Sequence, residues 1–138
     1  MNKEEKLKIY LLGACERTPL ATGKEKTEYQ KEFYEAKEKI LKYAENKSIT
    51  VEVIVPCDYD HLNKTGKWED YLKNDIKLLA DCDWAVDIEN GSEKSKGVML
   101  EKMICLALSI PVINLSDFNL MYNALLYNKY IEKEVKNE

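Results

Sequence analysis

Histidine is almost absent from this chain of 138 residues, and its four cysteines follow no familiar spacing. The cysteines include no C-x-x-C pair and form no short framework, which argues against disulfide cross-links and a dithiol redox motif. Cys57, Asp58 and His61, with Cys15 from another loop, have ligand types that suit zinc. Their C-x-x-x-H spacing matches structural zinc sites poorly, so we expect no metal site.

Long apolar stretches and an excess of positive charge are also missing. The charged first residues are followed by an apolar run of only a few residues, which is neither a signal peptide nor a membrane span. The formal net charge is −4, and lysines are interleaved with glutamates, so no basic footprint for a nucleic acid is present. These features predict a reduced, cytoplasmic protein that binds neither membranes nor nucleic acids.

The residues that are present, 45% hydrophobic and 33% charged, suit a single soluble domain over 1–138. Short apolar runs, each followed by a polar or turn-rich loop, predict four buried strands: Leu7–Leu12, Thr50–Val55, Trp84–Ile88 and Pro111–Leu115. Apolar side chains at helical spacing predict four helices, over residues 25–45, 68–80, 98–108 and 118–131.

The alternation of strands and helices indicates an α/β fold, a flavodoxin- or Rossmann-like three-layer sandwich with a parallel sheet of four or five strands. We expect the flavodoxin-like strand order 2-1-3-4. Ligands bind such sheets beyond the carboxyl ends of the strands, where the strand order reverses, here between the first and third strands. The loops at that point are Gly13–Thr22 and Glu89–Lys96.

A Ser-x-Gly-x-x-x-Glu segment at residues 95–101 follows the third predicted strand and opens a helix. Ser95 suits the N-cap, Gly97 lets a ligand approach the backbone, and the free N–H groups of a helix start favour an anion. Glu101 has apolar neighbours three and four positions away, where an unpaired carboxylate is costly. It could pair with Lys102 or with a partner helix, or lie at a solvated edge, but its place near the switch point favours a function.

Three aspartates lie near the third predicted strand. Asp81 and Asp83 flank its start and are typical of turn and capping chemistry. Asp75, in the middle of the preceding helix, fits a solvated helix face when it is considered alone.

Other features have structural interpretations. Cys82 and Cys105 lie among apolar residues and are expected to be buried thiols, and Cys15 is expected at most to line the pocket. The polar loop at 57–67 is expected to form a mobile rim over the site. Apolar residues of the last helix suit either the core or a subunit interface: Phe118, Met121, Tyr122 and Tyr127.

In their order and spacing these motifs resemble the nucleoside 2-deoxyribosyltransferase superfamily, including its deoxynucleotide N-hydrolase relatives. The resemblance extends from Lys8 to about Ile113. It rests on I-Y-x-x-G in the first strand (Ile9, Tyr10, Gly13), on Pro56 after the second, on D-I-x-x-L-x-x-C-D at 75–83 and on S-x-G-x-x-x-E at 95–101. The combination is more specific than any single motif.

The resemblance implies a role for each matching residue. Glu101 matches the family's nucleophile, and Asp75 matches an active-site aspartate that contacts the substrate. Ser95 and Gly97 match the loop that holds the sugar 5′ end or a 5′-phosphate.

At the end of the first strand, Tyr10 and Gly13 match the part of the family fold that lines the base pocket. Tyr10, and also Trp68, could stack on the base.

The chain departs from the family pattern in several places. Lys94 precedes Ser95 where family transferases often have an aspartate. Arg17 lies in the region where the nucleotide-hydrolysing branch often has an arginine, and we include it among the substrate-binding residues. Asn119 and Asn123 fall in the C-terminal segment, which in the family can complete a neighbour's site.

The sequence therefore predicts cleavage or transfer at the N-glycosidic bond of a (deoxy)nucleoside or nucleoside 5′-monophosphate, without a cofactor. Glu101 would attack C1′, while Asp75 would orient the substrate or relay a proton to the leaving base. Two alternatives stay open: a non-catalytic nucleotide-binding or sequestering module, and a hydrolase of a nicotinamide dinucleotide. A homo-oligomer is the expected assembly.

Overall fold

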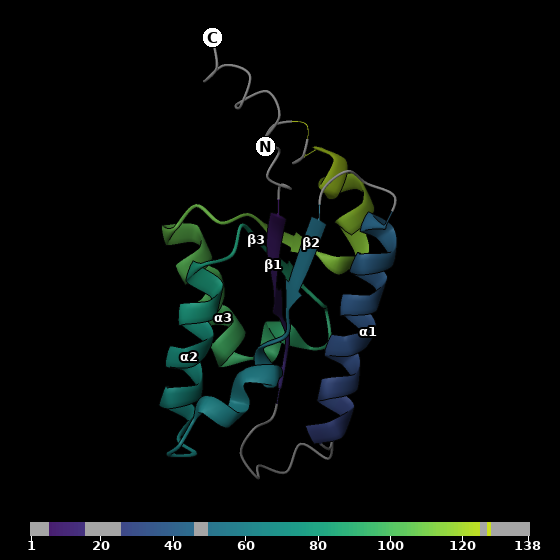
Figure 1. Ribbon diagram of the computed structural model, residues 1–138. Helices are drawn as coiled ribbons and strands as arrows, with labels where there is room; N and C mark the ends of the chain where they lie inside the picture. Colours follow the sequence, from purple (N-terminus) through teal and green to yellow (C-terminus); the bar gives the residue numbers. More distant parts are fainter. Residues whose placement is uncertain (1–5, 16–25, 46–49, 125–126, 128–138) are drawn as a thin grey trace, which may run out of the picture.

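The computed structural model describes residues 6–15, 26–45, 50–124 and 127 (Figure 1). In this part of the chain four strands form one sheet: β1 (Lys6–Leu12), β2 (Thr50–Ile54), β3 (Trp84–Asp87) and β4 (Val112–Asn114). The helices are α1 (Lys26–Ala44), α2 (Trp68–Ala80) and α3 (Lys96–Ala107), with short 3-10 turns η1 (Pro56–Leu62), η2 (Ser92–Lys94) and η3 (Leu115–Asp117).

The sheet has the order β2-β1-β3-β4, and all its neighbouring strands are parallel. In Figure 1, α1 covers one face of the sheet while α2 and α3 cover the other. The predicted three-layer α/β fold and the predicted strand order are therefore confirmed. Each strand begins and ends within one residue of its predicted range, because an apolar run buried on both faces is bounded by polar loops.

Side-chain alternation along β1 divides the core into two halves. Leu7, Ile9 and Leu11 pack beneath α1, whereas Tyr10 and Leu12 lie on the opposite face with residues of α2 and α3. This register places the Tyr10 side chain on the same side of the sheet as the helix that carries Glu101.

An aromatic cluster closes the α1 face of the sheet. Residues 118–124 are helical, and Phe118 and Tyr122 are buried against Tyr43 and Trp84. The ring centroids of Trp84 and Tyr122 are 5.6 Å apart in an edge-on arrangement. Of the two interpretations left open, Phe118 and Tyr122 are thus core residues. Most of the predicted continuation to residue 131 lies outside the described part.

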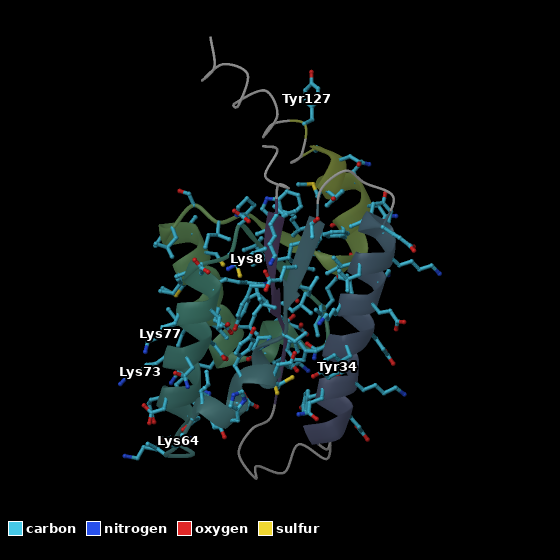
Figure 2. The ribbon with its side chains drawn as sticks, viewed as in Figure 1. Lys8, Tyr34, Lys64, Lys73, Lys77 and Tyr127 are labelled. Atoms are coloured by element: carbon cyan, nitrogen blue, oxygen red, sulfur yellow. The ribbon has the colours of Figure 1, made fainter. Side chains whose placement is uncertain are left out.

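The segment after β2 differs from the polar loop that the sequence suggested. Residues 56–62 form the 3-10 turn η1, because Pro56 fixes its first turn and both Pro56 and Cys57 are buried. The Tyr34 hydroxyl, on α1 (Figure 2), donates a hydrogen bond to Asp58 and ties η1 to that helix. Up to residue 62 the expected rim is therefore a 3-10 turn of which only the first two residues are buried.

No helix among the described residues is both long and apolar enough to cross a bilayer.

Candidate active site

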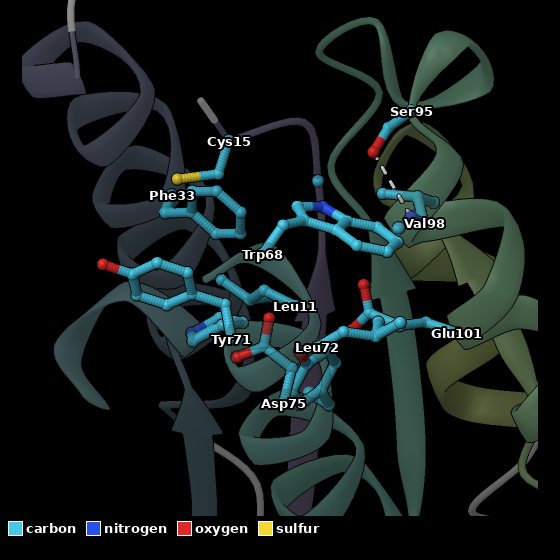
Figure 3. Close-up of a pocket in the computed structure, with 14 residues that line it drawn as sticks. Leu11, Cys15, Phe33, Trp68, Tyr71, Leu72, Asp75, Ser95, Val98 and Glu101 are labelled. Atoms are coloured by element: carbon cyan, nitrogen blue, oxygen red, sulfur yellow. Dashed lines mark hydrogen bonds between the residues drawn. The ribbon is translucent and has the colours of Figure 1, made fainter. Parts of the chain in front are cut away.

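A pocket lies beyond the carboxyl end of β1, between the first halves of α2 and α3 (Figure 3). Its space is about 440 Å³, the solvent-open mouth included. Six of the seven predicted site residues line it: Tyr10, Gly13, Asp75, Ser95, Gly97 and Glu101. The seventh, Arg17, lies outside the described residues. Asn119 and Asn123 are exposed and are not among the residues that line the pocket in this chain.

Glu101 is held inside this pocket by Tyr10. The Glu101 side chain projects from the face of α3 that packs on the sheet and is only 6% exposed. The Tyr10 hydroxyl donates a hydrogen bond of 2.5 Å to Oε2 of Glu101. This hydrogen bond holds the Glu101 carboxyl group in one orientation. The alternative of a solvated edge is excluded.

The second alternative for Glu101, a pair with Lys102, is also excluded. The Lys102 ammonium lies 2.7 Å from Oδ2 of Asp87, the last residue of β3. Consecutive helical side chains point about 100° apart, so Lys102 reaches the sheet end while Glu101 faces the pocket.

Asp75 lies in the same pocket, on the opposite wall. Its side chain projects from α2 and is 6% exposed, one helical turn before the buried Leu79. In Figure 3 the side chains of Asp75 and Glu101 enter the pocket from α2 and α3 respectively. The solvated helix face that the helical pattern allowed for Asp75 is therefore wrong, and two carboxyl groups share one pocket.

The start of α3 forms another part of the pocket wall. Ser95 is the N-cap, as predicted, and its Oγ accepts a hydrogen bond of 3.3 Å from the Val98 N–H. At Gly97 a Cβ atom would have one neighbour within 4 Å, the Ser95 Oγ at 3.8 Å. Packing therefore does not require glycine at this position.

Gly13, at the end of β1, is a glycine for a different reason. A Cβ atom there would lie 2.7 Å from the Ile88 side chain and 2.9 Å from the Phe33 ring. Any other residue would displace the core beneath the pocket floor.

Trp68 brings an aromatic ring to the pocket mouth. It is the first residue of α2, its side chain is 36% exposed, and the Lys96 ammonium lies 5.1 Å from its ring centre. Tyr10, in contrast, is fully buried, and its hydroxyl donates a hydrogen bond to Glu101. The expectation that the Tyr10 ring stacks on a base is corrected, since the ring has no exposed face.

A buried aspartate that sequence reasoning passed over organises the loop after β3. Asp87 accepts hydrogen bonds from the Ser92 hydroxyl at 2.5 Å, the Glu89 N–H at 2.8 Å and the Lys102 ammonium at 2.7 Å. Burial acts to raise the pKa of Asp87, but the bonds from Lys102, Ser92 and Glu89 outweigh it and lower that pKa. The sequence did contain a signal for Asp87, because it is an aspartate at the end of an otherwise apolar strand.

Asn90 joins the two loops that flank the switch point. Its side-chain oxygen accepts from the Ala14 N–H at 2.8 Å, and its amide donates to the Ala14 carbonyl at 2.9 Å. The two loops expected at the switch point are therefore in contact in their described parts. Asn90 carried no signal in the sequence, because the contact joins residues far apart in the chain.

The cysteines lie where the sequence predicted: Cys82 and Cys105 are buried, and Cys15 is at the pocket. Burial raises the pKa of Cys82 to about 12, and burial and the nearby charge of Glu101 raise the pKa of Cys105 to about 11. Cys15 is partly exposed and lines the pocket. No group of three or more histidine, cysteine, aspartate or glutamate side chains in the described ranges could hold a metal ion.

The aspartates at the start of β3 have the structural role predicted for them. Asp81 caps α2 and pairs with the Lys8 ammonium at 2.7 Å, while Asp83 accepts a hydrogen bond of 2.9 Å from the Lys8 N–H. Both lie away from the pocket.

Comparison with known proteins gives a family but no activity. The family model described as "Domain of unknown function (DUF4406)" matches residues 8–114, a range that includes every residue lining the pocket. No curated protein and no solved structure matches the chain. With more than two thirds of its length covered by that family model, the chain belongs to the DUF4406 family.

Proposed function

We propose that this protein cleaves or transfers the N-glycosidic bond of a (deoxy)nucleoside or nucleoside 5′-monophosphate, with Glu101 as the nucleophile. The observation that carries the proposal is the buried Glu101 carboxylate, oriented by Tyr10 in a pocket it shares with Asp75. The motif resemblance to the nucleoside 2-deoxyribosyltransferases supports the same chemistry.

Such a carboxylate suits a reaction that develops positive charge at carbon. As the C1′–N bond breaks, C1′ gains oxocarbenium character, and an Oε atom of Glu101 forms a bond to it. The bonding electron pair leaves with the base. Water or a second base then attacks C1′ and releases Glu101, as in retaining glycosidases.

The leaving base needs a proton, and Asp75 is the pocket residue suited to deliver it. Asp75 lines the same pocket as Glu101 and would pass a proton to a base nitrogen. Trp68, partly exposed at the mouth, offers the ring on which the base stacks.

The start of α3 would hold the other end of the substrate. The Ser95 hydroxyl and the N–H groups of the first helical turn are donors for a 5′ oxygen or a 5′-phosphate. The open space beside Gly97 lets that group approach the backbone. Lys96, which lies over Trp68, supplies a positive charge nearby.

The test is a chromatographic assay for free base. It uses nucleosides, deoxynucleosides, their 5′-monophosphates and a nicotinamide dinucleotide, with and without an acceptor base. We expect base release by the wild type and by the exposed control Glu93→Gln, and none by Glu101→Gln, which should fold normally.

Each outcome has a distinct meaning. Release that depends on an acceptor base identifies a transferase, and release without one identifies a hydrolase. Tight binding with no release from any substrate would identify a nucleotide-binding module and contradict the proposal. Release of nicotinamide alone would assign the dinucleotide reaction instead, and full activity of Glu101→Gln would remove Glu101 from the mechanism.

A further inference from the structure

The chain that follows β1 forms one wall of the pocket. Gly13 and Cys15 both line the pocket, and Ala14 is the single residue between them. Cys15 also packs against the core cluster that contains Phe33 (Figure 3). The position of this wall therefore depends on what holds the backbone of Ala14.

The Asn90 side chain holds that backbone as a neighbouring strand would. A residue of a paired strand donates its N–H and accepts at its carbonyl, and a side-chain amide can supply both partners. The Asn90 oxygen accepts from the Ala14 N–H at 2.8 Å, and the Asn90 nitrogen donates to the Ala14 carbonyl at 2.9 Å. Because hydrogen bonds are directional, the two together fix the orientation of the Ala14 backbone as well as its distance.

This contact extends the pairing of β1 with β3 beyond the sheet. The last backbone bond between the two segments runs from the Ile88 N–H to the Leu12 carbonyl, at 2.9 Å. The next residue, Gly13, lies so close to the Ile88 side chain that a Cβ atom would come within 2.7 Å of it. Asn90 then pairs with Ala14, so the end of β1 stays against the end of β3 as far as the pocket wall.

A third hydrogen bond ties Asn90 to α1. The Asn90 nitrogen also donates to Oε1 of Glu32, at 3.3 Å. A primary amide has two N–H donors, and both have an acceptor here. An aspartate of the same shape would keep the bond from the Ala14 N–H, but it would place an oxygen against the Ala14 carbonyl and the Glu32 carboxylate, where repulsion replaces two hydrogen bonds.

We propose that Asn90 is a positioning residue of the candidate active site, which sets the wall formed by Gly13 and Cys15 and, through it, the binding of the substrate. Asn90 is not among the residues that line the pocket, so it acts through that wall. Its part in substrate binding rests on the function proposed above, whereas its hold on the wall does not.

Alkylation of Cys15 tests the hold on the wall without any substrate. Asn90→Asp should raise the rate at which iodoacetamide modifies Cys15 by about threefold or more, because a released wall exposes the thiol more often. Asn63→Asp is the matched control and should leave the rate unchanged. The Asn63 side chain likewise accepts from backbone N–H groups and donates to a backbone carbonyl, but it does not line the pocket. An unchanged Cys15 rate in Asn90→Asp overturns the proposal.

Steady-state kinetics give a second readout. Asn90→Asp should raise KM about tenfold and leave kcat within about twofold, because the displaced wall weakens binding while the catalytic carboxyl groups keep their places. Adding Glu32→Gln to Asn90→Asp should lower KM part of the way back, because it removes one of the two repulsions. A lower kcat with KM unchanged would mean that less of the protein is folded, which contradicts a positioning role.

The two readouts separate this proposal from the proposed function. A wild type that releases no base contradicts the proposed function, and with it the part of Asn90 in substrate binding. The Cys15 rate still decides in that case whether Asn90 holds the wall.

Discussion

The Lys102 ammonium and the Asp87 carboxylate lie 2.7 Å apart, which joins the helix of the candidate nucleophile to the end of the central strand β3. The Asp87 side chain is buried and that of Lys102 is partly exposed. Through its bonds to Ser92 and to the Glu89 N–H, Asp87 also fixes the loop that leads to Ser95. One carboxylate thus sets the position of two sides of the pocket wall.

Replacing either member of this pair should destabilise the fold. We expect Asp87→Asn and Lys102→Met each to lower the free energy of unfolding by about 2 kcal/mol, because a hydrogen bond between charged groups is lost beside a buried partner. Lys73→Met is the control, since its exposed pair with Asp70 is 3.9 Å long and should contribute little. Urea unfolding measures all three. Equal effects of Lys102→Met and Lys73→Met would contradict this account.

The contribution of Asp87 should also depend on pH. Its pKa in the folded state is lowered, so the stabilisation is present above the unfolded value of about 3.9 and is lost as the pH falls through the folded value. The difference in unfolding free energy between wild type and Asp87→Asn should therefore shrink in acid. Urea titrations at a series of pH values from neutral to acid measure it. A difference that stays constant over that series would show that the charge of Asp87 is unimportant.

Most of the fold could be predicted from the sequence, because it rests on local patterns. The four apolar runs predicted the strands, and the helical stripes between them predicted the helices. The right-handedness of parallel crossovers then restricted the possible strand orders to a few. The segment 56–62 was the exception. A polar composition suggested a loop, whereas burial of Pro56 and Cys57 holds it in a 3-10 turn.

The site was harder to predict, because its contacts join residues distant in the chain. The motif spacing predicted that Glu101, Ser95 and Gly97 lie near the start of one helix. It could not show that the Tyr10 hydroxyl donates a hydrogen bond to Glu101, which is 91 positions away in the sequence. The burial of Asp75 likewise depends on how α2 packs against α3, which the helical period of α2 alone does not specify.

Tyr10 should act as a positioning residue for Glu101. Under the proposed function, Tyr10→Phe keeps the ring in the core but removes the hydrogen bond, so kcat should fall about tenfold to a hundredfold with KM little changed. Tyr34→Phe is a matched control, because it also removes a tyrosine–carboxylate bond, but at η1. Steady-state kinetics of both variants measure the effect. An unaltered kcat in Tyr10→Phe would show that the bond is only structural.

Gly97→Ala should separate stability from activity. Alanine is a better helix former than glycine, and a methyl group at this position meets only the Ser95 Oγ at 3.8 Å, so the variant should be about 0.5–1 kcal/mol more stable. The same methyl group would occupy the space proposed for the sugar 5′ end and should raise KM. Thermal unfolding and kinetics on one preparation measure both. A more stable variant with unchanged KM would exclude a ligand from this space.

Thiol reactivity should single out Cys15. Cys57, Cys82 and Cys105 are buried, and burial raises the pKa of the last two to about 12 and 11, so they carry almost no thiolate at neutral pH. Brief treatment with iodoacetamide should modify only Cys15, while all four cysteines should react in urea. Mass spectrometry of the peptides measures this. Early modification of Cys105 would indicate that α3 opens from the sheet.

The two tryptophans differ in exposure: Trp84 is 5% exposed inside the aromatic cluster, and Trp68 is 36% exposed at the mouth of the pocket. The emission of Trp84 should be blue-shifted and should change when the core unfolds. That of Trp68 should be red-shifted, open to aqueous quenchers and sensitive to whatever enters beside Lys96. The chain thus contains two fluorescent residues in different environments, one that reports on the integrity of the fold and one that reports on occupancy of the site.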